Sequence, residues 1–411
     1  MARSKHGIAE LLSDFPGGEY VARWEKAQEL MERAKVDGIL LARAENIAYY
    51  TGWRKFLDIS SVYFMLPRKG KPTLVAPHNQ KRIIEVVSPI EDVRYFGPSS
   101  LGFNDLTHTG LKVLRELGFT DKVVGLESNP QVVDQTVWDS WTKGHLRRKK
   151  VVDELIWRQR LVKSILELRY VRRVCDITCK AYTKALAEVR EGMTEREFTR
   201  ILYRTMVEEG AFDSPLLGFA HVAASPKYGM HDVRATDYKF QKKDTFLLDA
   251  GATYRGYWCD MTRVTCIGQP SKRQRELFDV SLEAELEGLD MLRPGVKISE
   301  VCKKVKSVIE KHGMVKNMGV YSGTDWYGHS LGLEVHERPD LVPSRPDSDV
   351  VLEPGMVFAI EPAICDDPII RSELGEYKPG GAGYFFVEDN ILVTEYGPEN
   401  LTPIPRELNV V

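Results

Sequence analysis

The chain has 411 residues, 43% of them hydrophobic, and a formal net charge of −2 at pH 7. This length exceeds what one hydrophobic core ordinarily holds, so two domains are expected, and the near-neutral charge excludes a surface built to bind nucleic acid. No apolar run approaches the roughly 20 residues of a membrane-spanning helix, and the start MARSKHGIAELLSD lacks the apolar core of a secretory signal, so we expect a cytoplasmic protein without a membrane partner.

The first part of the chain alternates helix and strand patterns. Residues 19–53 predict an amphipathic helix that stops at Gly38, a short buried strand GILLA and a second segment ending at Gly52. A hairpin with the turn RKGK follows, then the helix QKRIIEVV and the strand VRYF. This alternation predicts an α/β domain with a mixed sheet, and its histidines lack the spacing of a metal site.

The apolar periodicity changes near residue 160, where long helical patterns replace short alternating ones. We therefore expect domains at 1–160 and 161–411. Thr194 and Glu197 fit a capping box for one of the helices that follow. The six cysteines are too few for a disulfide framework, and Cys175 and Cys179, one helical turn apart, fit a packed face better than a redox or metal element.

From Phe240 onward the pattern becomes strand-like and carries two acids in apolar surroundings. In DTFLLDAG and YWCDMTRVTCIG, a hairpin tip at Tyr254 and Arg255 would place Asp249 directly opposite Asp260. Opposed carboxylates repel each other unless cations lie between them, so this pairing indicates a metal site. The alternative is a solvated hairpin with two surface acids, which the apolar flanks disfavour.

Two later acids and one histidine have similar surroundings. Pro362 favours an extended backbone at Glu361, which therefore ends a buried strand, and Glu388 interrupts the apolar run FFVEDNILV. Each acid alone would fit an edge-strand charge, but their coincidence with the aspartates favours a common site. His329 lies between glycines that disfavour a helix interior.

Together these side chains form an oxygen-rich ligand set with one imidazole. Such a set favours Mn²⁺, with Fe²⁺, Co²⁺ or Zn²⁺ also compatible, over the thiolate sites of structural zinc. Two such ions can activate a bridging water for amide hydrolysis. The predicted ligands are Asp249, Asp260, His329, Glu361 and Glu388.

The motifs DAGATYRGYWCDMTR, GHSLGLEVHERP, AIEP and VEDNILVTEYG resemble the creatinase, aminopeptidase P and prolidase branch of the pita-bread metallopeptidases. The resemblance extends to residues 1–160, which look like the smaller creatinase-like accessory domain. It implies an α/β (α+β) fold, a catalytic domain at 161–411, a homodimer and the five ligands named above as a dinuclear centre. Asp260 and Glu388 would then be shared between the metals, Glu361 would act as base, and His231 and His336 would line the substrate site.

Some positions depart from the family pattern. Phe386 stands where dipeptide-cleaving relatives carry an arginine that holds the substrate carboxylate, and Arg371 is a candidate replacement cation. Ser330 and Pro226 each stand where glycine is common in the family.

Three functions therefore remain open. The first is an Xaa-Pro peptidase, either aminopeptidase P-like or prolidase-like, acting on a small peptide. The second is a pita-bread enzyme for a small non-peptide substrate, as in ectoine hydrolases, creatinase or dimethylsulfoniopropionate lyases. The third is a catalytically silent binding module, which the complete ligand set disfavours.

Overall fold

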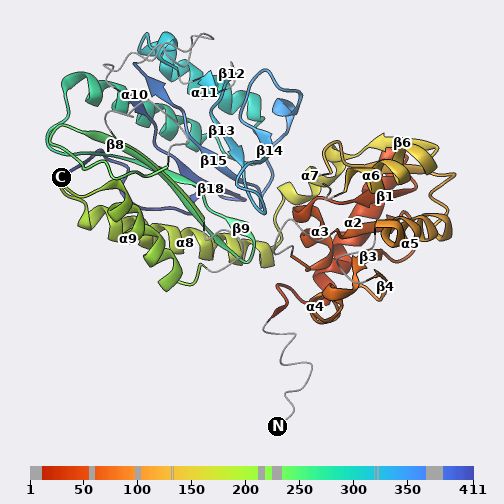
Figure 1. The fold of residues 1–411 in the computed structure, drawn as a ribbon. Coiled ribbons are helices and arrows are strands. Elements are labelled where there is room, and N and C mark those ends of the chain that lie inside the picture. Colours follow the sequence, from red (N-terminus) through yellow and green to blue (C-terminus); the bar gives the residue numbers. More distant parts are fainter. Residues whose placement is uncertain are drawn as a thin grey trace. The chain divides into compact units, whose positions relative to one another are not determined.

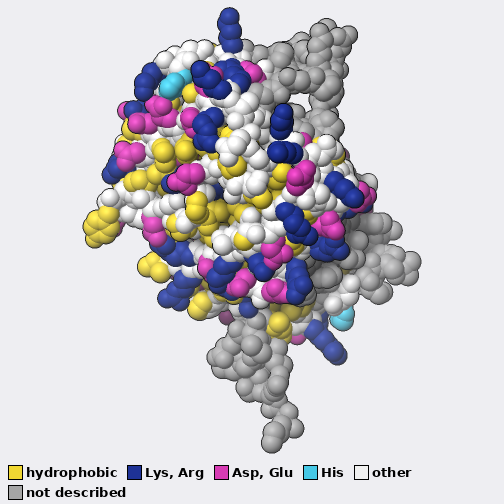
Figure 2. Space-filling view, turned by 90° about the vertical axis from the view of Figure 1, so that its left-hand side faces the viewer, with side chains coloured by type: hydrophobic (Ala, Val, Ile, Leu, Met, Phe, Trp, Pro, Cys, Tyr) yellow, Lys and Arg dark blue, Asp and Glu magenta, His cyan; other side chains and the backbone are white. Residues whose placement is uncertain are grey.

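A computed structural model describes residues 12–54, 61–97, 103–130, 132, 134–211, 218–224, 234–318, 320–321, 324–366 and 383–411. The chain divides into two compact units, Met1–Arg160 and Leu161–Val411. Within the described ranges, no helix combines the length and the apolar character needed to cross a membrane. Basic and acidic side chains are interspersed on the face drawn in Figure 2, as the small net charge implies.

The first unit is built on a six-stranded mixed sheet with the order β4-β3-β2-β1-β5-β6. Its strands are β1 (Gly38–Leu41), β2 (Tyr63–Pro67), β3 (Thr73–Pro77), β4 (Asp92–Phe96), β5 (Val123–Leu126) and β6 (Arg148–Val151). Its helices are α2 (Gly17–Ala34), α3 (Ala44–Thr51), α4 (Lys81–Val87), α5 (Phe103–Glu116), α6 (Gln135–Asp139) and α7 (Asp153–Leu161). Strand β1 pairs antiparallel with β2 and parallel with β5, which confirms the predicted mixed sheet.

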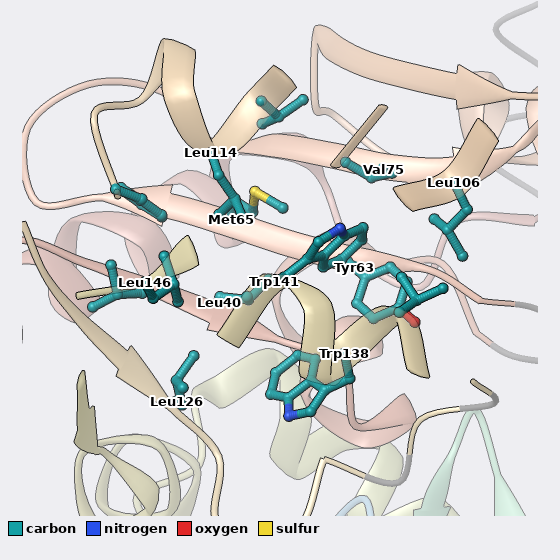
Figure 3. Packing of buried hydrophobic residues seen from close by; sticks show 14 of the residues in the cluster. Leu40, Tyr63, Met65, Val75, Leu106, Leu114, Leu126, Trp138, Trp141 and Leu146 are labelled. Atoms are coloured by element: carbon teal, nitrogen blue, oxygen red, sulfur yellow. The ribbon is translucent and has the colours of Figure 1, made fainter. Parts of the chain in front are cut away.

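Aromatic side chains fill the core of this unit (Figure 3). The rings of Tyr63 and Trp141 meet edge to face, with centroids 4.7 Å apart, and the Trp141 indole donates to the Thr107 carbonyl at 3.1 Å. A Cβ atom at Gly110 would come within 2.0 Å of the Trp141 ring. Glycine is therefore required at this point of α5, because only its bare backbone lets the helix approach the indole.

Within its described residues, the second unit contains two larger sheets and two short strand pairs (Figure 1). One sheet has the order β20-β10-β8-β7 with β9 attached to β8, and the other has the order β14-β13-β15-β18-β19. The strands of the first are β7 (Gly218–Ala224), β8 (Thr245–Tyr254), β9 (Tyr257–Trp258), β10 (Met261–Cys266) and β20 (Asn409–Val410). Those of the second are β13 (Gly328–Ser330), β14 (Glu337–Asp340), β15 (Val357–Ile360), β18 (Asp389–Thr394) and β19 (Gly397–Asn400). The shorter strands are β11 (Val320–Tyr321), β12 (Thr324–Asp325), β16 (Ile364–Cys365) and β17 (Tyr384–Phe385).

Helices cover the sheets of the second unit. They are α8 (Ile165–Glu188), α9 (Glu195–Glu208), α10 (Lys272–Asp290) and α11 (Ile298–Lys311). Helix α8 packs on β8 and α10 contacts β15. The capping box predicted for Thr194 and Glu197 is present at the start of α9. All six cysteines are free thiols, as expected, and Cys175 is fully buried on α8.

The two sheets of the second unit meet at Thr262 and Glu388, whose backbone groups exchange hydrogen bonds at 3.3 Å. The buried guanidinium of Arg263 lies behind this junction and donates to the carbonyls of Thr262 at 2.8 Å and Glu388 at 2.9 Å. It also donates to the Asp389 carboxylate at 2.8 Å. These bonds hold the start of β10 against the start of β18 and thereby position Asp260 and Glu388, which directly precede the two strands.

Candidate metal centre

The hairpin of β8 with β9 and β10 presents two aspartates on one face of its sheet. The predicted register was wrong: Asp249 lies opposite Thr262, and the tip is Arg255 and Gly256, both with positive φ. Such a two-residue turn suits the twist of antiparallel strands. The prediction from the sequence had placed this turn one residue too early. The observed register differs from the predicted one by two residues, so each side chain keeps its face of the sheet. Asp249 and Asp260 are therefore diagonal neighbours on the same face.

The second sheet contributes three further side chains. His329 on β13 pairs with Ala359 on β15, and Ile360 pairs with Asp389 on β18. Glu361, which follows β15 directly, and Glu388, which precedes β18, therefore continue one cross-strand row on the His329 side. The carboxylate Oε1 of Glu361 is 3.5 Å from His329 Nε2, and that of Glu388 is 3.7 Å away.

The structure brings all five predicted ligands together at the junction of the two sheets. One ligand atom from each of Asp249, Asp260 and Glu388 lies within 4.8 Å of the others, and the same holds for His329, Glu361 and Glu388. Glu388 belongs to both groups. The side chains of Asp260, His329 and Glu388 are at most 5% exposed, so they lack the bulk solvent that ordinarily stabilises charges.

The His329 imidazole is oriented as a ligand would be. Its Nδ1 lies 3.0 Å from the Ser330 carbonyl, which can only accept a hydrogen bond, so Nδ1 carries the proton. The Nε2 lone pair then points toward the acids, 3.6 Å from Asp260 Oδ2. Histidine ligands in metal sites characteristically use one nitrogen for the metal and donate from the other to a protein oxygen.

Several buried atoms in the cluster have no hydrogen-bond partner among the described residues: Asp260 Oδ1, His329 Nε2 and Glu388 Oε1. Buried polar atoms of folded proteins are nearly always satisfied. The donor atoms here are acidic oxygens and one imidazole lone pair, which is the chemistry that divalent cations bind. The residues therefore fit a metal centre.

The pKa values follow from burial and mutual repulsion. Burial raises the pKa of Asp260 and Glu388 well above the usual range, and neighbouring acids raise it further, Asp249 for Asp260 and Asp260 for Glu388. Burial alone would lower the pKa of His329, but the surrounding carboxylates outweigh it and raise that pKa well above its ordinary value. The metal-free cluster consequently holds protons, which cations would displace on binding.

Three supporting residues were not predicted from the sequence. The indole of Trp326 donates to Glu361 Oε1 at 3.0 Å, and the Thr262 hydroxyl donates to Glu388 Oε2 at 2.9 Å. The Asn390 side chain accepts from the backbone N–H of Asp260 at 3.0 Å and donates to its carbonyl. An asparagine inside the apolar run FFVEDNILV was the only available signal, since Trp326 and Thr262 have ordinary local contexts.

The structure places only some of the residues that were predicted to line the substrate site. His336 has a side chain that is 45% exposed, with Nε2 3.9 Å from Asp260 Oδ2 and its ring centroid 4.0 Å from that of His329. Phe386 is 1% exposed and packs edge-on against Tyr384. His231 and Arg371 lie outside the described residues, as does Pro226.

Comparison with known proteins gives consistent matches along the chain. A sequence model of metallopeptidase family M24 matches residues 169–395, and one of the creatinase/prolidase N-terminal domain matches residues 23–162. An Xaa-Pro dipeptidase of Pyrococcus horikoshii is 27% identical over 390 residues, covering 93% of this chain and 97% of that protein.

Solved structures of prolidases also match this chain along almost its whole length. The prolidase from Pyrococcus horikoshii superposes with a TM-score of 0.76 at 26% identity, covering 94% of this chain and 99% of that chain. The prolidase from Thermococcus sibiricus has a TM-score of 0.80 at 23% identity, covering 95% and 99%, and so supports the fold. The chain therefore belongs to metallopeptidase family M24, in its creatinase and prolidase branch, and has the predicted α/β fold of a creatinase-like domain followed by a pita-bread domain.

Proposed function

We propose that the protein is a dinuclear-metal hydrolase that cleaves Xaa-Pro peptides. The observation that carries this proposal is the convergence of four carboxylates and the Nε2 lone pair of His329 on one buried volume. Membership of a metallopeptidase family and relatives named Xaa-Pro dipeptidase support it.

In this proposal Asp249, Asp260, His329, Glu361 and Glu388 hold two divalent ions, with Asp260 and Glu388 shared between them. Glu388 suits sharing because it belongs to both ligand groups. Bound ions of this kind lower the pKa of a water molecule and polarise a substrate carbonyl. The oxygen-rich set favours Mn²⁺, and Fe²⁺, Co²⁺ or Zn²⁺ remain alternatives.

The protein's own groups would then handle the proton and the developing charge. Glu361, whose Oε1 accepts from the Trp326 indole, would accept the proton of the attacking water and return it to the amide nitrogen as the C–N bond breaks. His336, exposed beside Asp260, faces the incoming substrate and stabilises its oxyanion or its leaving amine. His231 remains a candidate for the same role.

The surroundings of Phe386 favour a longer peptide over a free dipeptide. A ring that is buried against Tyr384 supplies no cation for a substrate carboxylate. We therefore favour aminopeptidase P-like cleavage, with Arg371 as a candidate cation in the segment between Asp366 and Gly383. The same observation favours a second candidate function, hydrolysis of a small non-peptide amide, for which no carboxylate clamp is needed.

The proposal also assigns roles to the domains. Residues 1–160 would be the accessory domain and residues 161–411 the catalytic domain, and two chains would form a homodimer in the cytoplasm. The ranges matched by the two family models support this division. Light scattering of the purified protein would test the dimer.

The function is tested by metal analysis combined with a substrate panel. Purified protein should contain about two divalent ions per chain, lose activity on chelation and regain it with Mn²⁺. The panel contains Xaa-Pro dipeptides, longer Xaa-Pro peptides and small cyclic or quaternary-nitrogen amides. Cleavage of Xaa-Pro peptides supports the proposal, and cleavage of the longer peptides without the dipeptides supports its aminopeptidase P-like form. Cleavage of small amides alone supports the second candidate, and protein without metal contradicts both.

A further inference from the structure

A buried ion pair lies beside the metal centre. Lys163, the third residue of the second unit, has its Nζ 3.5 Å from Glu337 Oε2, and the two side chains are 1% and 4% exposed. The backbone N–H of Lys163 donates to the Gly355 carbonyl at 3.0 Å, which anchors this segment just before β15. Removing one partner of such a pair leaves an uncompensated buried charge.

Glu337 also holds the turn that carries His336. Its Oε1 accepts from the backbone N–H groups of Leu333 at 2.8 Å and Glu334 at 3.3 Å. A Cβ atom at Gly332 would lie 2.9 Å from both carboxylate oxygens, so glycine gives the carboxylate its place under the turn. The Gly332 carbonyl accepts from the backbone N–H of Trp258 at 2.8 Å, which joins the turn to β9 of the other sheet.

His336 depends on this turn for its position. It immediately precedes Glu337 in the sequence, and its imidazole lies in a group with Asp260 and His329 whose ligand atoms are within 4.8 Å of one another. Because its side chain is 45% exposed, surrounding packing restrains the imidazole less than it restrains His329. The bonds from Glu337 to the backbone of the turn add to the ring contacts that His336 makes with Trp326 and His329.

We propose that Lys163 and Glu337 are positioning residues, which fix the 332–336 turn so that the His336 imidazole faces the substrate side of the metal centre. The inference rests on the proposed function for the role of His336 in the reaction. It concerns a residue outside both family matches, since Lys163 lies between residue 162 and residue 169. The ammonium neutralises the carboxylate, and the carboxylate orders the turn.

A double-mutant cycle tests the coupling in the metal-loaded protein. Lys163→Met should lower kcat about 10- to 100-fold, as loss of a supporting residue does, while the metal content and the KM change little. In a His336→Ala background the same substitution should lower kcat less than about twofold further. Lys163→Arg retains the cation and should recover most of the activity. Equal losses in both backgrounds would overturn the proposal.

A second readout does not require activity. In Zn²⁺-loaded protein, the imidazole resonances of His336, assigned by their absence in His336→Ala, should shift or broaden in Lys163→Met. His312, whose Nε2 lies 2.7 Å from Glu283, should keep its resonances and serves as an internal control. Lys180→Met, which removes an exposed lysine from α8, is the matched variant and should change neither histidine.

The outcomes separate the two proposals. If wild-type protein cleaves no substrate of the panel while Lys163→Met displaces the His336 resonances, the proposed function fails and the positioning role stands. If wild-type protein is active and Lys163→Met leaves both kcat and the His336 resonances unchanged, the positioning role fails alone. Should Lys163→Met not fold, Lys163→Gln, which removes the charge but keeps a hydrogen-bond donor for Glu337, takes its place with the same expected direction of change.

Discussion

The two units bury acids in opposite ways. In the first unit, Glu127 is 5% exposed, and its carboxylate accepts from the backbone N–H of Ala42 at 2.7 Å, that of Arg43 at 3.1 Å and Asn46 Nδ2 at 2.5 Å. In the second unit, Asp260 Oδ1 and Glu388 Oε1 find no hydrogen-bond partner among the described residues. Burial alone therefore does not mark a functional acid.

Asp389 shows the same contrast within one strand. It is fully buried beside Glu388, but Arg263 donates to its Oδ1 and Arg406 to its Oδ2. Both oxygens of Glu127 and of Asp389 are supplied with donors from the protein, whereas Asp260 Oδ1 and Glu388 Oε1 have no donor among the described residues. These two oxygens are therefore available to a cation.

The largest expected effect comes from a ligand substitution. Glu388→Gln should lower kcat/KM more than about 100-fold, beyond the loss typical of supporting residues, because it removes the carboxylate of the residue that belongs to both ligand groups. In chelated protein the same change should raise the melting temperature, since it removes one of several repelling carboxylates. A lowered melting temperature after chelation would place Glu388 with the structural acids.

The pH dependence of stability should differ between metal-free and metal-loaded protein. The pKa values of Asp260, Glu388 and His329 are raised in the folded state, so their protonated forms favour folding below their ordinary pKa values. That contribution is lost as the pH rises toward the raised values, so chelated protein should become less stable as the pH rises above the ordinary carboxyl range.

Cations should reverse this trend, because they replace the protons. Mn²⁺ at 100 times its dissociation constant should add about 3 kcal/mol per bound ion to the free energy of unfolding. Denaturant titrations at several pH values, with and without Mn²⁺, measure both effects. A gap between the two curves that does not grow with pH would contradict proton displacement.

Substitution of the structural acid Glu127 should lower stability, whereas Glu388→Gln in chelated protein should raise it. Glu127→Gln should lower the free energy of unfolding by about 1–3 kcal/mol, because one amide cannot accept from Ala42, Arg43 and Asn46 together. Asn46 cannot turn over freely, since its Oδ1 accepts from Arg160 at 2.8 Å. The change should occur equally in chelated and metal-loaded protein.

Glu127 has its own pH signature. Burial raises its pKa from 4.5 to about 7, so its neutral form favours folding and this stabilisation is lost as the pH rises from about 4.5 to about 7. Glu127→Gln should remove that slope from the pH profile of unfolding. An unchanged slope would show that other groups dominate it.

The smallest expected effect concerns Trp326. Trp326→Phe keeps a ring beside His336 but removes the donor to Glu361 Oε1, and kcat should fall about tenfold. Metal content should stay near two ions per chain, which distinguishes this variant from Glu388→Gln. Metal loss equal to that of the ligand variant would show that Trp326 supports the ligand set rather than the base.

The sequence was informative where charged residues interrupt apolar runs. Asp249, Asp260, Glu361 and Glu388 each do so, and their coincidence, rather than any one of them alone, predicted a common site. The hairpin register could not be predicted in this way, because it depends on the backbone of Arg255 and Gly256, where positive φ moves the tip by one residue. Trp326 and Thr262 escaped prediction because their function lies in a hydrogen bond to a residue distant in sequence, which periodicity does not report.

The bond between the Thr262 hydroxyl and Glu388 joins residues 126 positions apart. Such contacts form late, since long loops must close before they contribute any stability. The cluster therefore cannot collect its full complement of cations on a partly folded chain. Full binding of cations therefore requires a completely folded second unit, and a chain on which only part of the ligand set has come together would retain metal weakly.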